Sequence, residues 1–237
     1  MTHRLYLAPP LASGTTRLLD ADANHYLTRV LRLRSGAPLV CFDGQGKEFA
    51  GTVERQGKTM AIAVGALQQE QQPPPALHLV LAWLKSQAMD NAVQKATELG
   101  ISDFWPLLAT RSNVKIDAKR TRGRLDHWRK VAIHACQQSE RLFVPTVHEP
   151  VDLEAWLAAN QELHIILLAP GAPPITAPQE PSPLALLVGP EGGWTEAETA
   201  LAQQHGALSG GLGRWVLRAE TAPLAALASV RHSWGWR

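Results

Sequence analysis

The chain has 237 residues, of which 45% are hydrophobic, enough to bury a core in one large domain or two small ones. Its formal net charge is only +2, and it holds no apolar stretch long enough to span a bilayer. Residues 1–10 lack the basic and apolar regions of a signal peptide, so we expect a cytoplasmic protein with no membrane partner.

Short segments with β character fill the first part of the chain. Each is bounded by Gly, Asp or Lys, a pattern typical of a small β-barrel. They cover residues 4–7, 38–42, 48–54 and 59–64. The next stretch, residues 68–75, is polar and rich in proline, so it is predicted to be a linker that continues neither a helix nor a central strand. We therefore expect a first domain at residues 1–72 and a second at residues 73–237.

Strands alternate with helices after this linker. Four apolar runs predict strands buried on both faces of a sheet, at residues 77–82, 104–107, 164–168 and 184–188. Two helical faces lie between them, one formed by Met89, Ala92, Val93, Ala96 and Leu99 and the other by Leu125, Trp128, Ala132 and Ala135. A proline-rich loop at residues 169–183 is predicted to be a surface excursion. The second domain is thus expected to be α/β.

Basic residues gather between positions 111 and 141. The segment holds nine Lys and Arg residues against three acidic ones, so its charge is +6 while the rest of the chain is −4. A solvated helix face explains part of this, but such clustering is typical of a protein that binds a polyanion. We expect nucleic acid, gripped also by the first domain. The basic residues are Arg111, Lys115, Lys119, Arg120, Arg122, Arg124, Arg129, Lys130 and Arg141, and in the first domain Arg4, Arg17, Arg29, Arg32 and Arg34.

A glycine-rich loop at residues 188–194 joins a predicted strand to a predicted helix. Thr195 and Glu198 have the spacing of a capping box, so a helix should begin just after the glycines. Ligands bind at such places, because glycines let a backbone approach a bound molecule. The loop matches neither a P-loop nor a Rossmann fingerprint, and Glu191 would repel a phosphate but not a cationic ligand. By itself the loop favours a plain tight turn.

A second loop at residues 212–222 changes this interpretation. Together the loops resemble the SPOUT class of RNA methyltransferases and, within it, the RsmE family, which methylates N3 of a uridine in small-subunit ribosomal RNA. That family shows Gly-Pro-Glu-Gly-Gly and then Leu-Gly-x-x-Ile/Val-Leu-Arg-x-Glu-Thr, found here at residues 189–193 and 212–221. Similar segments lie at residues 29–32, 43–46, 95–100, 111–112, 138–141 and 144–145, and departures at Ser86, Gln87, Trp215 and Pro223.

The resemblance implies a PUA-like β-barrel followed by a SPOUT α/β domain with a C-terminal trefoil knot, and S-adenosylmethionine as the methyl donor. True knots are confined to a few folds, so no periodicity argument predicts one. Threading would bring three loops into one pocket, where backbone groups meet the adenine edge and leucines cover its faces. The leucines are alternatively ordinary core residues. The expected cofactor-binding residues are Leu168, Gly189, Glu191, Gly192, Leu212, Gly213 and Leu217.

Methylation of uridine N3 requires loss of a proton from a weakly acidic imide. Arg218 is the first catalytic candidate, since an arginine beside O2 or O4 would stabilise the developing negative charge. Glu191 is the candidate proton acceptor, although a carboxylate before a helix is equally suited to the helix dipole. Glu220 and Thr221 are alternatively the N-cap of a last helix at residues 223–230. Arg4, Arg29, Arg32, Arg111, Arg122, Arg124 and Arg141 are the predicted RNA-binding residues.

The predicted partners are therefore 16S ribosomal RNA or the small ribosomal subunit, and a second copy of the chain. A homodimer is expected because the resemblance implies two knotted domains packed through the last helix, near Val230, Trp234 and Trp236. No metal site is expected, and Cys41 and Cys136 are read as inert thiols because they lack ligand-like spacing. Two alternatives stay open: a SPOUT methyltransferase for another rRNA or tRNA base, and a non-catalytic RNA-binding assembly factor.

Overall fold

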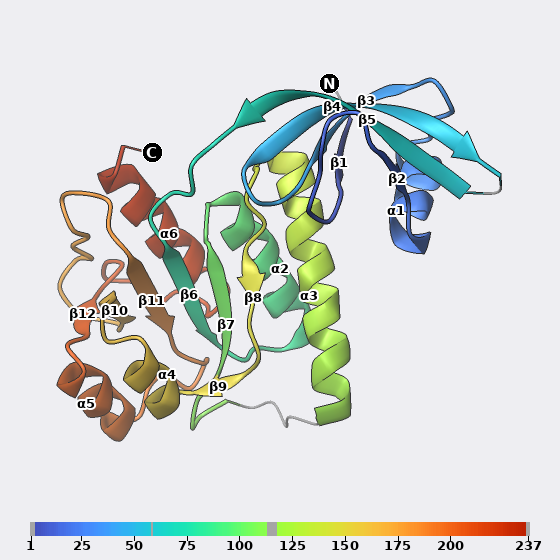
Figure 1. Cartoon of the computed structure of the whole chain (residues 1–237). Helices are drawn as coiled ribbons and strands as arrows, with labels where there is room; N and C mark the ends of the chain where they lie inside the picture. Colours follow the sequence, from blue (N-terminus) through green and yellow to red (C-terminus); the bar gives the residue numbers. More distant parts are fainter. Residues whose placement is uncertain (1–2, 58, 113–117, 236–237) are drawn as a thin grey trace. The chain divides into compact units, whose positions relative to one another are not determined.

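The computed structural model describes residues 3–57, 59–112 and 118–235 (Figure 1). Backbone contacts divide the chain into two compact units. The first consists of Met1–Pro73 and Cys136–Val144, and the second of Pro74–Ala135 and Pro145–Arg237. The first unit therefore includes a segment from the middle of the chain. A single boundary near residue 72 would place that segment in the second domain.

The first unit is built on a five-stranded sheet with the order β1-β3-β4-β5-β2. Its strands are β1 (Arg4–Tyr6), β2 (Thr16–Leu18), β3 (Pro38–Phe42), β4 (Lys47–Gln56) and β5 (Thr59–Glu70). The β1–β3 pair is parallel and the other pairs are antiparallel. Leu5 at one edge and Leu19 beside the other belong to the same buried core, so the sheet encloses that core. A short helix α1 (Ala21–His25) continues into a π-helical turn η1 (Tyr26–Val30).

The predicted start of the linker at residue 68 was wrong. Residues 68–70 continue strand β5, where Gln69 pairs with Glu48 and Glu70 with Lys47. All three residues are exposed, so their polar side chains remain hydrated while their backbone pairs with β4. The segment without regular secondary structure begins only at Gln71.

The second unit contains a seven-stranded parallel sheet. The order is β12-β10-β11-β6-β7-β8, and β9 also pairs with β7. The strands are β6 (Leu77–Ala82), β7 (Asp103–Leu108), β8 (Thr146–Val147), β9 (Val151–Asp152), β10 (His164–Leu168), β11 (Leu184–Val188) and β12 (Leu208–Gly210). The helices are α2 (Ser86–Glu98), α3 (Ala118–Ser139), α4 (Leu153–Ala159), α5 (Glu196–Gln204) and α6 (Ala222–Ser233). Helix α3 contributes its last residues to the first unit.

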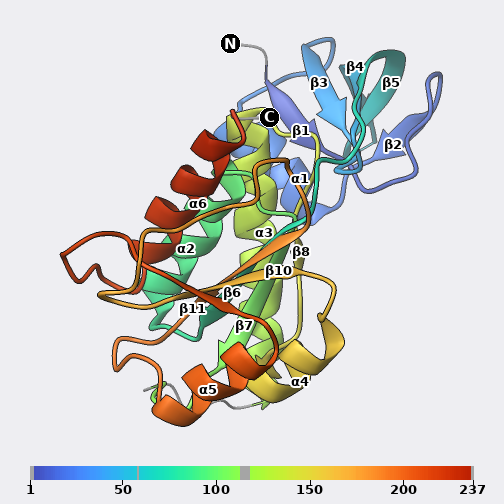
Figure 2. The same cartoon turned by 90° about the vertical axis from the view of Figure 1, so that its left-hand side faces the viewer.

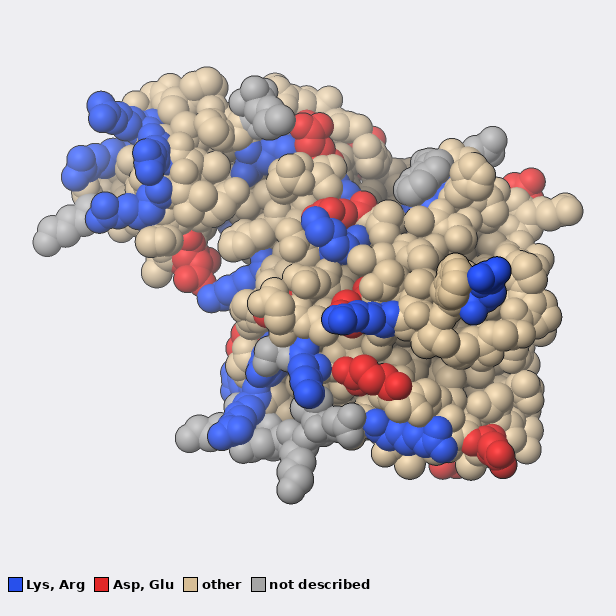
Figure 3. Space-filling model, turned by 180° about the vertical axis from the view of Figure 1, so that it is seen from behind, with Lys and Arg blue, Asp and Glu red and all other residues tan. Residues whose placement is uncertain are grey.

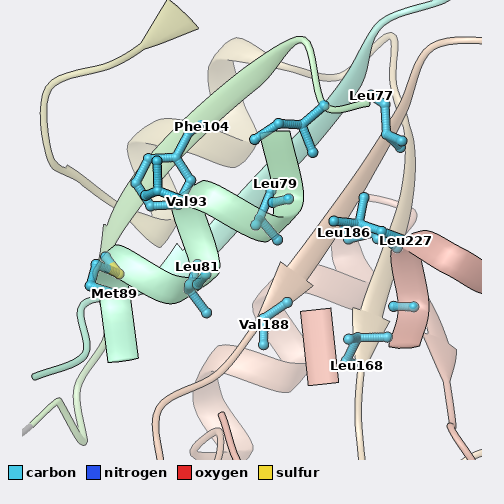
Figure 4. Packing of buried hydrophobic residues seen from close by; sticks show 14 of the residues in the cluster. Leu77, Leu79, Leu81, Met89, Val93, Phe104, Leu168, Leu186, Val188 and Leu227 are labelled. Atoms are coloured by element: carbon cyan, nitrogen blue, oxygen red, sulfur yellow. The ribbon is translucent and has the colours of Figure 1, made fainter. Parts of the chain in front are cut away.

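Helices cover both faces of this sheet (Figure 2). On one face Leu79 and Leu81 pack with residues of α2, α3 and α6, including Met89 and Leu227 (Figure 4). On the other, Val80 lies in a core shared with α4 and α5. Successive residues of β6 thus lie in the two cores in turn, which confirms that the strand is buried on both faces. The predicted helical faces are confirmed too: the residues of both sets are buried except Leu99, which is half-buried.

The exposed apolar patch expected near the end of α6 was wrong for two of its three residues, whereas the dimer itself stays a prediction. Val230 and Trp234 are buried in the core of the second unit, not exposed. The Trp234 indole Nε1 donates a hydrogen bond to the Pro178 carbonyl at 3.0 Å, so even its polar edge has a partner inside the unit. Trp236 lies outside the described residues.

Candidate active site

Three loops of the second unit surround a hollow of about 150 Å³. They follow β10, β11 and β12, three strands of one parallel sheet, so they meet at its carboxyl edge, where α/β folds bind ligands. The predicted convergence of these three segments is thus confirmed. The lining residues are Leu168, Ala169, Pro170, Val188, Gly189, Pro190, Glu191, Gly193, Trp194, Gly210, Leu212, Gly213, Trp215, Val216, Leu217, Ala219 and Ala222.

Most of the predicted cofactor residues line this hollow. They are Leu168, Gly189, Glu191, Leu212, Gly213 and Leu217. Gly213 has a φ of 103°, a left-handed conformation that favours glycine, and a Cβ added there would have no neighbour within 4 Å. The backbone at Gly213 therefore has open space beside it.

Gly192 is absent from the lining. A Cβ added to Gly192 would lie 3.1 Å from the Cβ of Arg111, so the close approach that requires a glycine here is to a neighbouring side chain. Gly192 stays a prediction as a cofactor residue, but the structure gives it a packing role.

Arg111 holds the glycine loop by two hydrogen bonds. Its Nη1 donates to the carbonyl oxygens of Gly192, at 3.1 Å, and Trp194, at 3.2 Å. These bonds join segments about eighty residues apart in sequence, so the spacing of the residues gave no sign of them. The guanidinium that was predicted to meet RNA phosphate therefore already has backbone partners beside the pocket.

Trp194 fixes two of the pocket loops to each other. Its indole Nε1 donates to the Leu168 carbonyl at 3.1 Å, and its ring lies where a Cβ on Gly189 would come within 3.0 Å. Gly189 is thus needed for the ring to pack. Sequence reasoning missed this role, although Trp194 comes directly after the glycines.

The helix after the glycine loop begins with the predicted capping box. The Thr195 Oγ1 accepts from the Glu198 backbone N–H, and the Glu198 carboxylate accepts from the Thr195 N–H at 2.8 Å. The other carboxylate oxygen accepts from the Thr110 N–H, also at 2.8 Å. Burial disfavours the charged carboxylate, but the hydrogen bonds from Thr110 and Thr195 prevail and lower the pKa of Glu198. The capping box therefore also ties the segment before Arg111 to α5.

Glu191 lies before this helix and lines the pocket with an exposed side chain. Glu196 and Glu198 supply the acidic groups of the first helical turn. The dipole of α5 thus has its own carboxylates, which leaves Glu191 available for a role in the pocket.

Arg218 stands between two lining residues, Leu217 and Ala219, with its side chain 86% exposed. It forms a long ion pair with Glu220, with 3.9 Å between Nη1 and Oε1. Thr221 is the N-cap of α6 by position, but its side chain makes no capping hydrogen bond. The helix begins with Pro223 in its first turn, as predicted.

Arg4 differs from the other predicted RNA-binding residues, because its side chain is only 9% exposed. It pairs with Glu48, its Nη2 donates to the Glu140 carbonyl at 3.5 Å, and its guanidinium lies over the Phe42 ring. These partners all belong to the first unit. These contacts give Arg4 a bracing role within the first unit.

The other predicted RNA-binding arginines are at least partly accessible. Arg29 and Arg32 are exposed beside the π-helical turn, and Arg32 has a left-handed φ of 55° as the chain leaves that turn. Arg122 is exposed on α3, while Arg124 and Arg141 are half-buried. Lys115 lies outside the described residues. Figure 3 shows Lys and Arg side chains over both units on this side of the molecule.

The described residues contain no group of three or more His, Cys, Asp or Glu side chains placed to hold a metal ion. No helix among them is long and apolar enough to cross a membrane. Both cysteines are buried, and burial raises the pKa of each thiol to about 11.

Comparison with known proteins identifies the family. An RNA methyltransferase domain matches residues 71–231, and an RNA methyltransferase PUA domain matches residues 19–64. Ribosomal RNA small subunit methyltransferase E of Synechocystis sp. is 30% identical, over 97% of this chain and 77% of that protein. The Bacillus subtilis protein of the same name is 28% identical, over 94% of this chain and 92% of its own length.

Solved structures agree. Ribosomal RNA small subunit methyltransferase E of Neisseria gonorrhoeae, bound to S-adenosyl methionine, superposes with a TM-score of 0.87 at 31% identity, over 99% of this chain and 98% of that one. A Legionella pneumophila protein described as a methyltransferase, in complex with the cofactor SAM, gives a TM-score of 0.92 at 32% identity, over 98% of both chains. The expected fold class, a PUA-like domain followed by a SPOUT α/β domain, is confirmed. The chain belongs to the RNA methyltransferase family, among the ribosomal RNA small subunit methyltransferase E proteins.

Proposed function

We propose that this chain transfers a methyl group from S-adenosylmethionine to N3 of a uridine in 16S ribosomal RNA. The observation that carries the proposal is the three-loop pocket at the carboxyl edge of the sheet. Relatives with the same fold are named for methylation of small-subunit ribosomal RNA, and two similar structures hold the cofactor. The trefoil knot belongs to the proposal as well, supported by backbone hydrogen bonds between residues 173–175 and Gly211.

The pocket residues fit S-adenosylmethionine. The walls combine apolar side chains, among them Leu168, Leu212 and Leu217, with loop backbone that can meet the edge of an adenine. The open space beside Gly213 allows a ligand to approach the backbone closely. Glu191 adds a carboxylate suited to a cationic ligand. When bound, S-adenosylmethionine supplies a methyl group on a positively charged sulfur.

Arg218 and Glu191 then have complementary roles toward the uracil ring. Arg218 is exposed beside the pocket, where its guanidinium can donate hydrogen bonds to O2 or O4 and stabilise the charge left when N3 loses its proton. Glu191 accepts that proton. The exposed pair with Glu220 holds Arg218 only weakly, so its side chain can turn toward a substrate.

RNA is held mainly through its phosphates. The accessible arginines of the two units, Arg29, Arg32, Arg122, Arg124 and Arg141, supply charge that is independent of base sequence. Arg111 and Arg4 act indirectly, by bracing the glycine loop and the first unit. We further propose a cytoplasmic homodimer that acts on 16S RNA or the small subunit. The dimer rests on the family resemblance, and light scattering that gave a monomer at micromolar concentration would reject it.

Mass spectrometry of 16S ribosomal RNA tests the function. RNA from a strain lacking the protein should lose one N3-methyluridine, and the purified protein with S-adenosylmethionine should restore it. Restoration of a methyl group on another base would indicate a different specificity. Calorimetry is the companion measurement, since absence of S-adenosylmethionine binding at millimolar ligand would leave only an RNA-binding role.

A further inference from the structure

An exposed aromatic side chain forms part of the pocket wall. Trp215 lines the hollow, yet the residue is 70% exposed. It belongs to the loop between β12 and α6, which stands out from the second unit at the left of Figure 2. Large aromatic side chains normally contribute to stability by burial, so one this exposed beside a pocket suggests a surface for a ligand.

A cation already covers one face of this indole. The Arg214 guanidinium carbon lies 4.2 Å from the Trp215 ring centroid. A nucleobase between the guanidinium and the ring would need about 3.5 Å on each side, more than the 4.2 Å present. The guanidinium therefore leaves no room for a base on that face of the indole. A planar ligand would stack on the opposite face. The guanidinium also places positive charge beside the ring, which favours a ligand that carries phosphate.

The surroundings favour a nucleobase over an apolar partner. Two exposed arginines, Arg214 and Arg218, flank Trp215 along the loop. Alternating positive charge with an aromatic face is the arrangement that proteins use to bind single-stranded nucleic acid. A base must also leave its stack to reach a methyl donor in a pocket, and an aromatic platform compensates for the stacking lost.

We propose that Trp215 stacks on a nucleobase of the RNA substrate at the mouth of the pocket, either the target uracil or its neighbour, and positions it for methylation. This inference rests on the proposed function. Trp215 acts on the substrate, whereas Trp194 fixes the loops that form the pocket.

The test measures kinetics and RNA binding for Trp215→Ala, Trp215→Phe and Leu208→Ala. Trp215→Ala should lower kcat/KM for ribosomal RNA by roughly 5- to 150-fold, the range expected for one lost base stack. Trp215→Phe should recover most of this, since phenylalanine keeps an aromatic face. Leu208→Ala is the matched control, because Leu208 is an exposed apolar residue of the preceding strand β12, 55% exposed, and does not line the pocket. Its kcat/KM should stay within a few-fold of the parent protein.

A spectroscopic experiment tests the contact without catalysis. The protein is labelled with 5-fluorotryptophan, and the ¹⁹F resonance absent from Trp215→Phe is assigned to residue 215. Adding a short oligouridylate in the absence of S-adenosylmethionine should shift that resonance. No shift at saturating RNA, or equal kcat/KM for Trp215→Ala and the parent, would overturn the inference.

Light scattering completes the design. If Trp215→Ala changes the mass of the assembly, the indole is covered by a second copy of the chain and the stacking proposal fails. If the parent protein methylates no ribosomal RNA at all, the proposed function fails instead, so the two failures are distinct.

Discussion

Glu198→Ala should destabilise the second unit and weaken the cofactor pocket together. The carboxylate accepts hydrogen bonds from the backbone N–H of Thr110 and of Thr195 and from the Thr195 hydroxyl, all at 2.8 Å. Loss of the capping contribution costs about 1 kcal/mol, and loss of the charged bond to Thr110 about 2 kcal/mol more. For a chain of this length, about 3 kcal/mol should lower Tm by roughly 6–12 °C.

The assay pairs melting curves with calorimetric titration of S-adenosylmethionine. Glu196→Ala is the control, because Glu196 is an exposed carboxylate in the first turn of the same helix. It should cost only about 0.3–1 kcal/mol, through the helix dipole. If Glu198→Ala lowered Tm no more than Glu196→Ala does, the capping box would not brace the loop, and the reasoning would be refuted.

The pH dependence of this effect has a definite sign. Although burial opposes ionisation, hydrogen bonds from Thr110 and Thr195 lower the pKa of Glu198 from its ordinary value of 4.5. A carboxyl group with a lowered folded pKa stabilises the protein fully above the unfolded pKa, and this stability is lost as pH falls through the folded value. The Tm difference between the parent and Glu198→Ala should therefore be constant near neutral pH and shrink below about pH 4.5.

Three further predictions concern the substrate and the pocket. Arg218→Ala should slow single-turnover methylation by ~100-fold or more with Tm and cofactor affinity nearly unchanged, and Lys should restore only part of the rate; full activity would remove Arg218 from the mechanism. Gly192→Val should lower Tm and cofactor affinity together, because its side chain would press on Arg111; lost affinity at unchanged Tm would favour direct contact with the ligand. Arg122→Ala should reduce the slope of log affinity against log salt by roughly 1 if Arg122 meets one phosphate, and an unchanged slope would place the RNA surface elsewhere.

Strands of the second unit could be predicted well from sequence. The runs at residues 77–82, 164–168 and 184–188 match the observed strands at both ends, because central parallel strands are hydrophobic on both faces. The meeting of the three pocket loops was expected from the resemblance, through threading, because β12 (Leu208–Gly210), which precedes the third loop, was not among the predicted strands. Strand β5 was harder, since its last residues are polar and exposed and only their pairing with β4 shows that they are strand.

The roles of individual arginines could not be predicted from sequence. Arg4 and Glu48 are 44 residues apart, and Arg111 and Gly192 are 81 apart, so no local pattern joins either pair. A basic residue on a charged segment therefore looks the same whether it braces a loop or faces solvent. Trp234 was misplaced for a related reason: a large apolar group near a chain end fits a contact surface and a core equally well until the loop that covers it is known.

Helix α3 belongs to both units, so the chain cannot be cut into two pieces that each hold one whole unit. Cys136, Leu142 and Phe143 form a small apolar cluster with Phe42 and Tyr6 of the first unit. A fragment ending near residue 73 would leave Phe42, which is fully buried, without those neighbours. Recombination that joins genes at one point would carry away only part of this unit, because exchange of the whole unit needs three junctions, after residues 73, 135 and 144. The two units should accordingly be inherited together.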